Sequence, residues 1–461
     1  MKKFLGSFGF SPIAFVQLVF ITVNAQLIYA FWDIRNTLPK DFPIALGVTD
    51  AEAGTLYSMQ GLVIILGTIA LGWIGDRFRI RNIMLTATLA VGGISLFMTV
   101  ASPHLSFPVL LACFFAMLLF SEVLFKPANF KAVRVSTTEE HQGVAFSFFE
   151  GSRGLMAFVI SLVWTAMVAS GADSKTIMMT ASVIVLVTAV LVFVAVPKDA
   201  RVGDDDMTAS STLEAIKGVG KVAKMPVVWF AGINVFCVYG TYVAAGTYFA
   251  RYLQAGYGTA AVVTAVFAPV VIGLRMLPLV TGALVDRLFK SAAHFMRFME
   301  IILAVLLAAI ALIFFTSPAA VTEFPAGETP QDIVPGATFW ALIVLMLCAS
   351  ACCFMIRGVY YAPIGEFGVP AKHSSSAMSF AITLGYIPAL LGPIVFGSII
   401  VPSIKNDAGD IVTEVLTPTN VLGGAFLGLA ALALVACVMS TVMVKLKAKR
   451  DAEGESATAS A

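Results

Sequence analysis

The chain has 461 residues, 59% of them hydrophobic and 12% charged, with a formal net charge of +2. Soluble domains carry about 25% charged residues, whereas the apolar residues here form blocks of roughly 18 or more, enough for a helix to cross ~30 Å of hydrocarbon. These features exclude a soluble protein and predict an all-α polytopic membrane protein, while the ~10-residue alternating segments of a transmembrane β-barrel are absent.

The first apolar block follows Lys2 and Lys3 and continues through Trp32. It is longer than the ~7–15-residue core of a signal peptide, so we interpret it as an uncleaved first helix. Eleven further blocks follow it. We therefore expect twelve transmembrane helices, near residues 12–34, 53–74, 83–101, 107–128, 143–170 and 175–196, and then near 226–252, 260–284, 298–316, 337–361, 375–401 and 419–444.

A polar segment separates the two sets of six. We interpret residues 198–225 as a cytoplasmic linker with a short amphipathic helix near 212–224, between an N-terminal half (1–197) and a C-terminal half (226–446). Residues 447–461 are charged and small, which predicts a disordered tail.

Basic residues set the expected orientation. With the N-terminus in the cytoplasm, twenty Lys and Arg residues fall in cytoplasmic loops or tails, and three (Lys40, Lys175 and Lys405) fall in outer loops. The positive-inside rule then predicts that both termini are cytoplasmic. We expect a bacterial inner membrane protein.

One short motif occurs in both sets of helices. "GWIGDRF" at 72–78 follows the second helix and "GALVDRL" at 282–288 follows the eighth, 210 residues later. Parallel six-helix halves related by an axis along the membrane normal are typical of alternating-access transporters. The repeat predicts two pseudo-symmetric halves.

On this motif the chain resembles the major facilitator superfamily (MFS). Gly72, Asp76, Arg77 and Arg81 fit the family's loop signature, although Arg79 and Ile80 stand where a glycine and a basic residue are usual. The matching residues of the second half are Gly282, Asp286 and Arg287. The resemblance implies the twelve-helix MFS fold and a cytoplasmic gate whose contacts set the populations of two states without binding substrate.

Six basic residues remain inside the predicted helices: Arg35, Lys126, Arg153, Arg251, Arg275 and Arg357. Fewer acidic residues accompany them: Asp33, Glu122 and Glu150, with Glu300 and Glu366 near the cytoplasmic surface. A charge inside the membrane costs at least ~2.5–3.5 kcal/mol, so each one requires a partner or a function. The excess of cations indicates a bound anionic substrate.

Helical spacing pairs some of these charges. Glu122 and Lys126 are four residues apart and Glu150 and Arg153 are three apart, so each pair shares a helical face. Such a network is either a neutral clamp between helices or a proton or gate switch. Arg275 and Arg357 have no acid at helical spacing and are candidates to line a central cavity.

Arg35 in "YAFWDIRN" and Arg251 in "TYFARYL" lie 216 residues apart, at similar depths on helices 1 and 7. Either is a snorkelling anchor by itself, but two related guanidinium groups could grip one anion from both halves. Tyr29, Trp32 and Tyr248, with Tyr239 and Tyr242, could stack on the rest of the ligand.

This arrangement resembles the organophosphate:phosphate antiporter branch of the superfamily, in which an arginine on helix 1 and another on helix 7 grip the phosphate. The chain departs from that branch elsewhere. Gly67 or Thr68 replaces its helix 2 basic residue, Ser152 replaces its helix 5 histidine, and its helix 8 acid is absent. The resemblance therefore implies the anion grip and leaves the substrate open.

We expect a secondary active transporter that moves a phosphorylated, sulfonated or carboxylated metabolite, with protons or phosphate as coupling species. The alternative is a proton-coupled symporter of a neutral or zwitterionic solute, in which Glu150 or Glu122 titrates. Hydrolase and nucleotide-binding motifs are absent, so we predict that it is not an enzyme. The six cysteines lie in apolar runs, and the adjacent Cys352 and Cys353 have no His or Asp nearby. We expect no metal, no cofactor, no nucleic acid partner and a monomer in the lipid bilayer.

Overall fold

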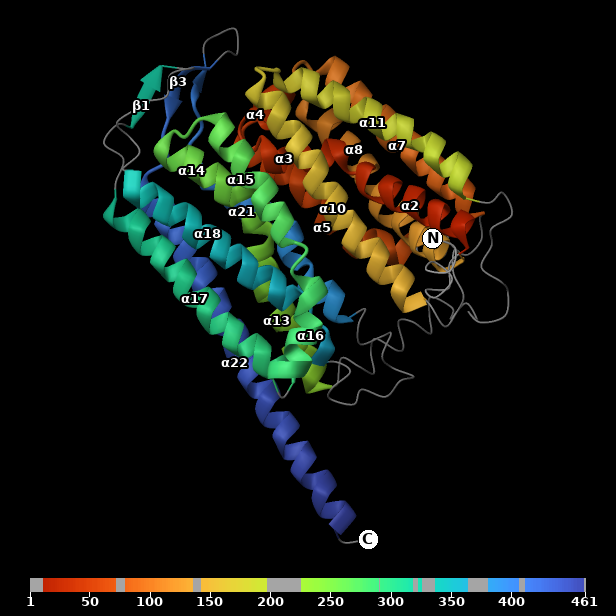
Figure 1. The fold of residues 1–461 in the computed structure, drawn as a ribbon. Helices are drawn as coiled ribbons and strands as arrows, with labels where there is room; N and C mark the ends of the chain where they lie inside the picture. The colour runs from red at the N-terminus through yellow and green to blue at the C-terminus, as the bar shows by residue number, and fades with distance from the viewer. Residues whose placement is uncertain are drawn as a thin grey trace.

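The computed structural model describes residues 11–459 except 72–78, 136–141, 197–224, 290, 318–321, 326–335, 364–379 and 406–410. Figure 1 shows two groups of helices side by side, one from red to yellow and the other from green to blue. Each group has its own hydrophobic core. One core joins buried residues between Leu18 and Val196, and the other joins those between Val228 and Met443.

The first half is a run of helices that occupies the first six predicted blocks. These helices are α2 (Pro12–Leu27), α3 (Ala30–Thr37), α4 (Asp41–Leu46), α5 (Asp50–Leu71), α7 (Ile80–Ala101), α8 (Phe107–Leu118), the π-helical η1 (Leu119–Phe125), α9 (Lys126–Val135), α10 (Gln142–Ala169) and α11 (Ser174–Ala195).

The second half repeats this pattern. It contains α13 (Pro226–Val243), the π-helical η3 (Ala244–Tyr248), α14 (Phe249–Tyr257), α15 (Ala261–Leu274), α16 (Pro278–Leu288), α17 (Ala292–Thr316), α18 (Gly336–Arg357), α21 (Ile387–Ser398) and α22 (Thr419–Ala459).

Local sequence sets where several helices begin. Ser11 caps α2, with its Oγ accepting from the amide of Ala14, and Pro12 occupies the first turn. Asp173 caps α11 and Ser291 caps α17 in the same way. Such caps satisfy backbone donors that have no partner within the helix.

In the described part of the chain, nine helices are long and apolar enough to cross a membrane, or ten if the bent pair α2 and α3 is one span. The bend between α2 and α3 is 54°. It follows a tightened turn in which the amide of Tyr29 donates to the carbonyl of Gln26. A helical membrane fold is therefore present, and the number of twelve spans stays a prediction.

Two expectations differ from the structure. The fold is not wholly helical, because β1 (Glu323–Pro325), β3 (Ile411–Val415) and β2 (Ile404–Lys405) form a small antiparallel sheet in that order. The β-branched residues of "IVTEV" favour a strand. The tail expected to be disordered continues α22 to Ala459 and projects from the bundle (Figure 1), because its Ala, Glu, Lys and Arg residues extend a helix that is already nucleated. The amphipathic helix expected at 212–224 lies outside the described residues.

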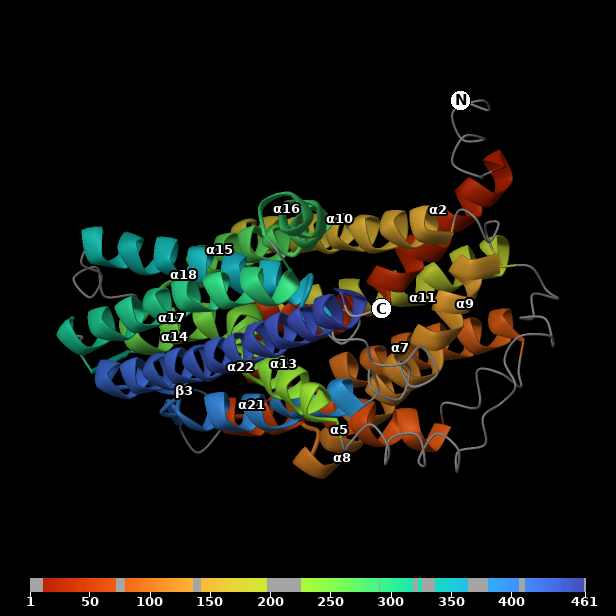
Figure 2. The same cartoon turned by 90° about the horizontal axis from the view of Figure 1, so that it is seen from below.

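We call the end of the bundle that carries this small sheet the sheet end. Figure 2 shows the same bundle from below, with α22 running along the second half and α10 beside α15 between the halves.

Candidate functional site

A central cavity of about 310 Å³ lies between the two halves. Its wall contains residues of α2, α3, α5, η1 and α10 from the first half, and of α13, η3, α18 and α21 from the second. Both π-helical segments reach it. Such segments widen one turn of a helix and are frequent at functional sites.

Arg35 of α3 forms one side of the cavity. Its guanidinium carbon lies 3.7 Å from the centroid of the Trp32 ring and 5.0 Å from that of Tyr57. These rings pack on Phe114 behind them. The Nε atom of Arg35 is buried and has no hydrogen-bond partner. The aromatic faces thus hold a guanidinium group that retains donors for a ligand.

Arg275 and Arg357 form the opposite side. They share one aromatic ring, because their guanidinium carbons lie 5.7 Å and 4.2 Å from the centroid of Tyr242 on α13. Nε of Arg275 is buried without a hydrogen-bond partner. Arg275 directly follows α15 and Arg357 ends α18, so two separate helix ends bring these cations together.

The predicted pair of Glu122 and Lys126 is present on the cavity wall. Nζ of Lys126 lies 3.1 Å from Oε2 of Glu122, whose side chain is only 4% exposed. Gln60 of α5 donates to Oε1 of Glu122 at 3.0 Å. Arg153 also lines the cavity, while the side chain of Glu150 lies outside the described residues.

Asp33, to which the sequence assigned no role, also lines the cavity. Its carboxylate accepts hydrogen bonds from Gln26 at 3.0 Å and from Asn36 at 3.4 Å. Asn36 in turn accepts from Thr247 of the second half at 2.9 Å. The side-chain amide of Asn36 therefore links the carboxylate of Asp33 in the first half to Thr247 in the second half.

Gln26, Asp33 and Asn36 were missed as lining residues although the sequence carried a signal for them. With the predicted Tyr29 they recur at spacings of three, four and three, which places all four on one helical face. A polar stripe of this kind in an apolar block marks a face that points away from lipid. Tyr29 and Trp32, predicted on other grounds, line the cavity as well.

The charges of the described side chains on the cavity wall are unbalanced. Lys126 and Glu122 form an ion pair, and besides that pair the three arginines Arg35, Arg275 and Arg357 line the cavity with one carboxylate, Asp33. Among these described groups, cations therefore exceed carboxylates. A concave site with an excess of one sign attracts ligands of the opposite sign.

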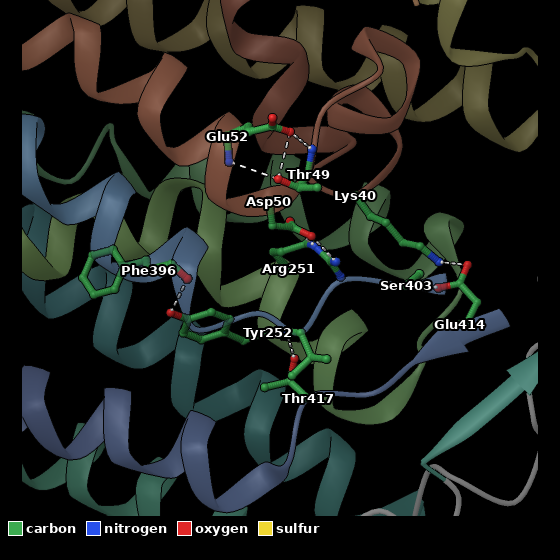
Figure 3. Close-up of polar contacts among 11 residues, drawn as sticks. Lys40, Thr49, Asp50, Glu52, Arg251, Tyr252, Phe396, Ser403, Glu414 and Thr417 are labelled. Atoms are coloured by element: carbon green, nitrogen blue, oxygen red, sulfur yellow. Dashed lines mark hydrogen bonds and ion pairs between the residues drawn. The ribbon is translucent and has the colours of Figure 1, made fainter. Parts of the chain in front are cut away.

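Arg251 lies elsewhere, at the sheet end (Figure 3). Its Nε and Nη2 atoms each lie 2.7 Å from a carboxylate oxygen of Asp50, the first residue of α5. The two arginines expected to grip one anion therefore do not share the central cavity. Their spacing of 216 residues exceeds the 210-residue repeat by six, and six residues of helix move a side chain by roughly 9 Å. Tyr248, three residues earlier, does line the cavity.

Further contacts close the sheet end between the halves. Lys40 pairs with Glu414 of β3 at 2.6 Å. Helices α5 and α21 meet so closely that a Cβ atom added to Gly54 would lie 2.2 Å from the carbonyl oxygen of Pro393. Glycine permits this approach because it has no side chain.

The residues of the expected cytoplasmic gate are only partly described. Gly72, Asp76 and Arg77 lie outside the described residues, and only the backbone of Gly282 and Asp286 is described, within α16. Arg287 is exposed near the end of α16. Arg81 is buried and donates to the carbonyl of Phe193, and its guanidinium lies over the Phe193 ring. Arg81 therefore joins α7 to α11 within the first half.

Comparisons with known proteins agree with this architecture. The sequence profile described as Major Facilitator Superfamily matches residues 13–393. Inner membrane protein YihN of Escherichia coli (strain K12) is 21% identical over 391 residues, which cover 82% of this chain and 86% of YihN. Inner membrane protein YqcE of the same organism is 23% identical over 352 residues, covering 74% and 77% of the two chains.

Solved transporter structures share the fold. The nucleoside transporter NupG superposes with a TM-score of 0.66 at 14% identity, covering 94% of this chain and all (100%) of NupG. A D-xylose-proton symporter superposes with a TM-score of 0.64 at 11% identity, covering 94% and 97%. At such low identities these similarities establish the fold and leave the substrate undetermined.

Proposed function

The chain belongs to the Major Facilitator Superfamily and is a secondary transporter in a membrane, and we propose that its substrate is a small organic anion. The observation that supports this substrate class is the set of three arginines, Arg35, Arg275 and Arg357, that line the described cavity wall with only Asp33 as a carboxylate outside the ion pair of Glu122 and Lys126. The volume of about 310 Å³ is at the lower limit of ordinary small-ligand sites, ~300–1,000 Å³, and suits a small metabolite.

In this proposal the anion lies between Arg35 of the first half and the pair Arg275 and Arg357 of the second. A guanidinium group presents a planar fork that matches the oxygens of a phosphate, sulfonate or carboxylate group. The faces of Trp32 and Tyr242 support these cations and offer apolar surface to the rest of the ligand. Arg275 and Arg357 thus replace Arg251 as the binding groups of the second half. The finer similarity to organophosphate:phosphate antiporters is part of this proposal.

We assign the sheet end to the outer side of the membrane. The positive-inside rule predicts that both termini are cytoplasmic, and the E. coli relatives are inner membrane proteins. The ion pairs of Asp50 with Arg251 and of Lys40 with Glu414 join the two halves at that end. Rocking of the halves would break these pairs and expose the cavity outward.

The pair of Glu122 and Lys126 supports an alternative, the proton-coupled symport of a neutral or zwitterionic solute. Glu122 is nearly inaccessible and lies on the cavity wall, where protonation would release Lys126. In this alternative, uptake of an uncharged solute depends on pH and is lost in Glu122→Gln, while anions fail to stabilise the purified protein.

The decisive test is thermal-shift screening of the purified protein with phosphorylated, sulfonated and carboxylated metabolites. A ligand at 100 times its Kd stabilises a protein by about 2.7 kcal/mol, which raises the melting temperature measurably. We expect Arg35→Lys to abolish this shift, because lysine retains the charge but loses the fork. Arg251→Lys is the matched control and should retain the shift, since Arg251 lies outside the cavity. The absence of any anion-dependent shift in the native protein would refute the proposal.

A further inference from the structure

A buried polar cluster lies in the core of the second half, among residues that do not line the cavity. Glu300 of α17, Asn234 of α13 and Ser440 of α22 are all fully buried. Nδ2 of Asn234 donates to Oε1 of Glu300 at 2.7 Å, and lies 3.0 Å from the carbonyl oxygen of Ala436 and 2.9 Å from Oγ of Ser440. One amide group thus joins three helices.

The first half contains a matching cluster without an acid. Nδ2 of Asn24 on α2 lies 3.3 Å from Oγ1 of Thr88 on α7 and 3.1 Å from Oγ1 of Thr188 on α11. Asn24 and Asn234 are 210 residues apart, the same spacing as the repeated loop motif. The two clusters therefore occupy equivalent positions, and Glu300 stands where the first half uses threonine.

Two oxygen atoms of the second cluster have no hydrogen-bond donor. They are Oε2 of Glu300 and Oδ1 of Asn234, and they belong to the two groups that already meet through Nδ2 and Oε1. Oδ1 of Asn24 is unsatisfied too, so an unsatisfied amide oxygen is common to both halves. The unsatisfied carboxyl oxygen, Oε2 of Glu300, is found only in the cluster of the second half.

The groups around Glu300 do not balance a negative charge. Cys237 of α13 and Cys437 of α22 are its titratable neighbours. Arg297 is three residues earlier on α17, Arg357 of α18 lines the cavity, and Lys445 of α22 is exposed. None of these cations forms an ion pair with Glu300 in the described part of the chain. A lone buried carboxylate is strongly unfavourable in an apolar core.

We propose that Glu300 holds a proton within the buried core of the second half and that its Oε2–H group donates to Oδ1 of Asn234. The resulting acid–amide pair has two hydrogen bonds, because Nδ2 of Asn234 already donates to Oε1. A single proton then satisfies both orphan oxygens and removes the buried charge. Glu300 is thus a proton-binding site that fastens α17 to α13 and α22, independent of the anion in the cavity.

Infrared spectroscopy of the native protein and Glu300→Gln tests this protonation state at neutral pH. The difference spectrum should lose the C=O band of a carboxylic acid, whereas loss of the bands of an ionised carboxylate would overturn the proposal. Glutamine has the shape of the neutral acid and repeats both hydrogen bonds, so the variant should melt at the native temperature.

Two further variants distinguish the hydrogen bonds between Glu300 and Asn234 from general effects of packing. Glu300→Ala should melt well below Glu300→Gln, since it removes one acceptor of Nδ2 of Asn234, leaves Oδ1 of Asn234 without a donor and creates a cavity. In the first half, Thr88→Ala is the matched control and should leave the carboxylic-acid band unchanged. A Glu300→Gln variant that fails to fold, or that melts as low as Glu300→Ala, would also contradict a neutral Glu300.

Discussion

The ion pair of Asp50 and Arg251 provides a direct test of how the sheet end stays closed. Asp50→Asn removes the charge and leaves an amide of the same shape. In the structure both carboxylate oxygens of Asp50 are 2.7 Å from nitrogen atoms of Arg251, and the two side chains are only 17% and 9% exposed.

The expected magnitude follows from this partial burial. Removing one partner of a buried pair costs about 3–5 kcal/mol, while an exposed pair contributes about 0.2–1 kcal/mol. Asparagine can still accept one hydrogen bond from Arg251, so we expect Asp50→Asn to disfavour the closed sheet end by ~2 kcal/mol. Since 1.4 kcal/mol corresponds to a tenfold change, the open population should rise about 30-fold.

Spin-label distances measure this population. Ile44 of α4 and Val412 of β3 are 40% and 44% exposed and lie on opposite halves at the sheet end, so labels there report its opening. The six native cysteines would first be replaced. Double electron–electron resonance should show one short distance in the native background and an added longer distance in Asp50→Asn.

The reversed pair, Asp50→Arg with Arg251→Asp, is the control and should recover part of the short distance, because the attraction is restored. Arg251→Lys retains the charge with fewer donors and should give a smaller shift than Asp50→Asn. Identical distance distributions in the native protein and Asp50→Asn would refute the reasoning that this pair holds the sheet end closed.

Two further perturbations follow from the close contacts of the site. Gly54→Val introduces a side chain at a position where a Cβ atom alone would lie 2.2 Å from the carbonyl oxygen of Pro393. The same spin labels should therefore report separation of the two halves. An unchanged short distance would contradict the packing of α5 on α21. Lys126→Met leaves the buried carboxylate of Glu122 without its cationic partner and should cost about 3 kcal/mol of stability, measured by thermal unfolding. Addition of Glu122→Gln should recover most of that loss, and equal stability of Lys126→Met and the native protein would show that the pair contributes nothing.

The membrane architecture could be predicted from the sequence because it depends on composition within short windows. A block of about 20 apolar residues partitions into a bilayer whatever its neighbours are, and helices occupy the predicted blocks. The pair of Glu122 and Lys126 was predictable for a similar reason, since a spacing of four places two side chains on one helical face. The family followed from a motif and its repeat, and the match over residues 13–393 confirms it.

Partners on different helices were not predictable in this way. Arg251 was expected beside Arg35, yet it pairs with Asp50, 201 residues away, whereas Arg275 and Arg357 meet at Tyr242 on a third helix. Asp33 had no assigned role, and the sequence did not indicate that Glu300 is fully buried between helices of the second half.

The reason is geometric. The spacing along one helix is local and nearly constant, so the sequence by itself determined the helical blocks, the charge content and the near-neighbour pairs of this protein. The register between helices depends on the 54° bend of α2 and α3, on the π-helical turns η1 and η3, and on how closely glycine lets α5 approach α21. Only the tertiary structure combined these shifts, and it thereby decided which cations line the cavity and which one closes the sheet end.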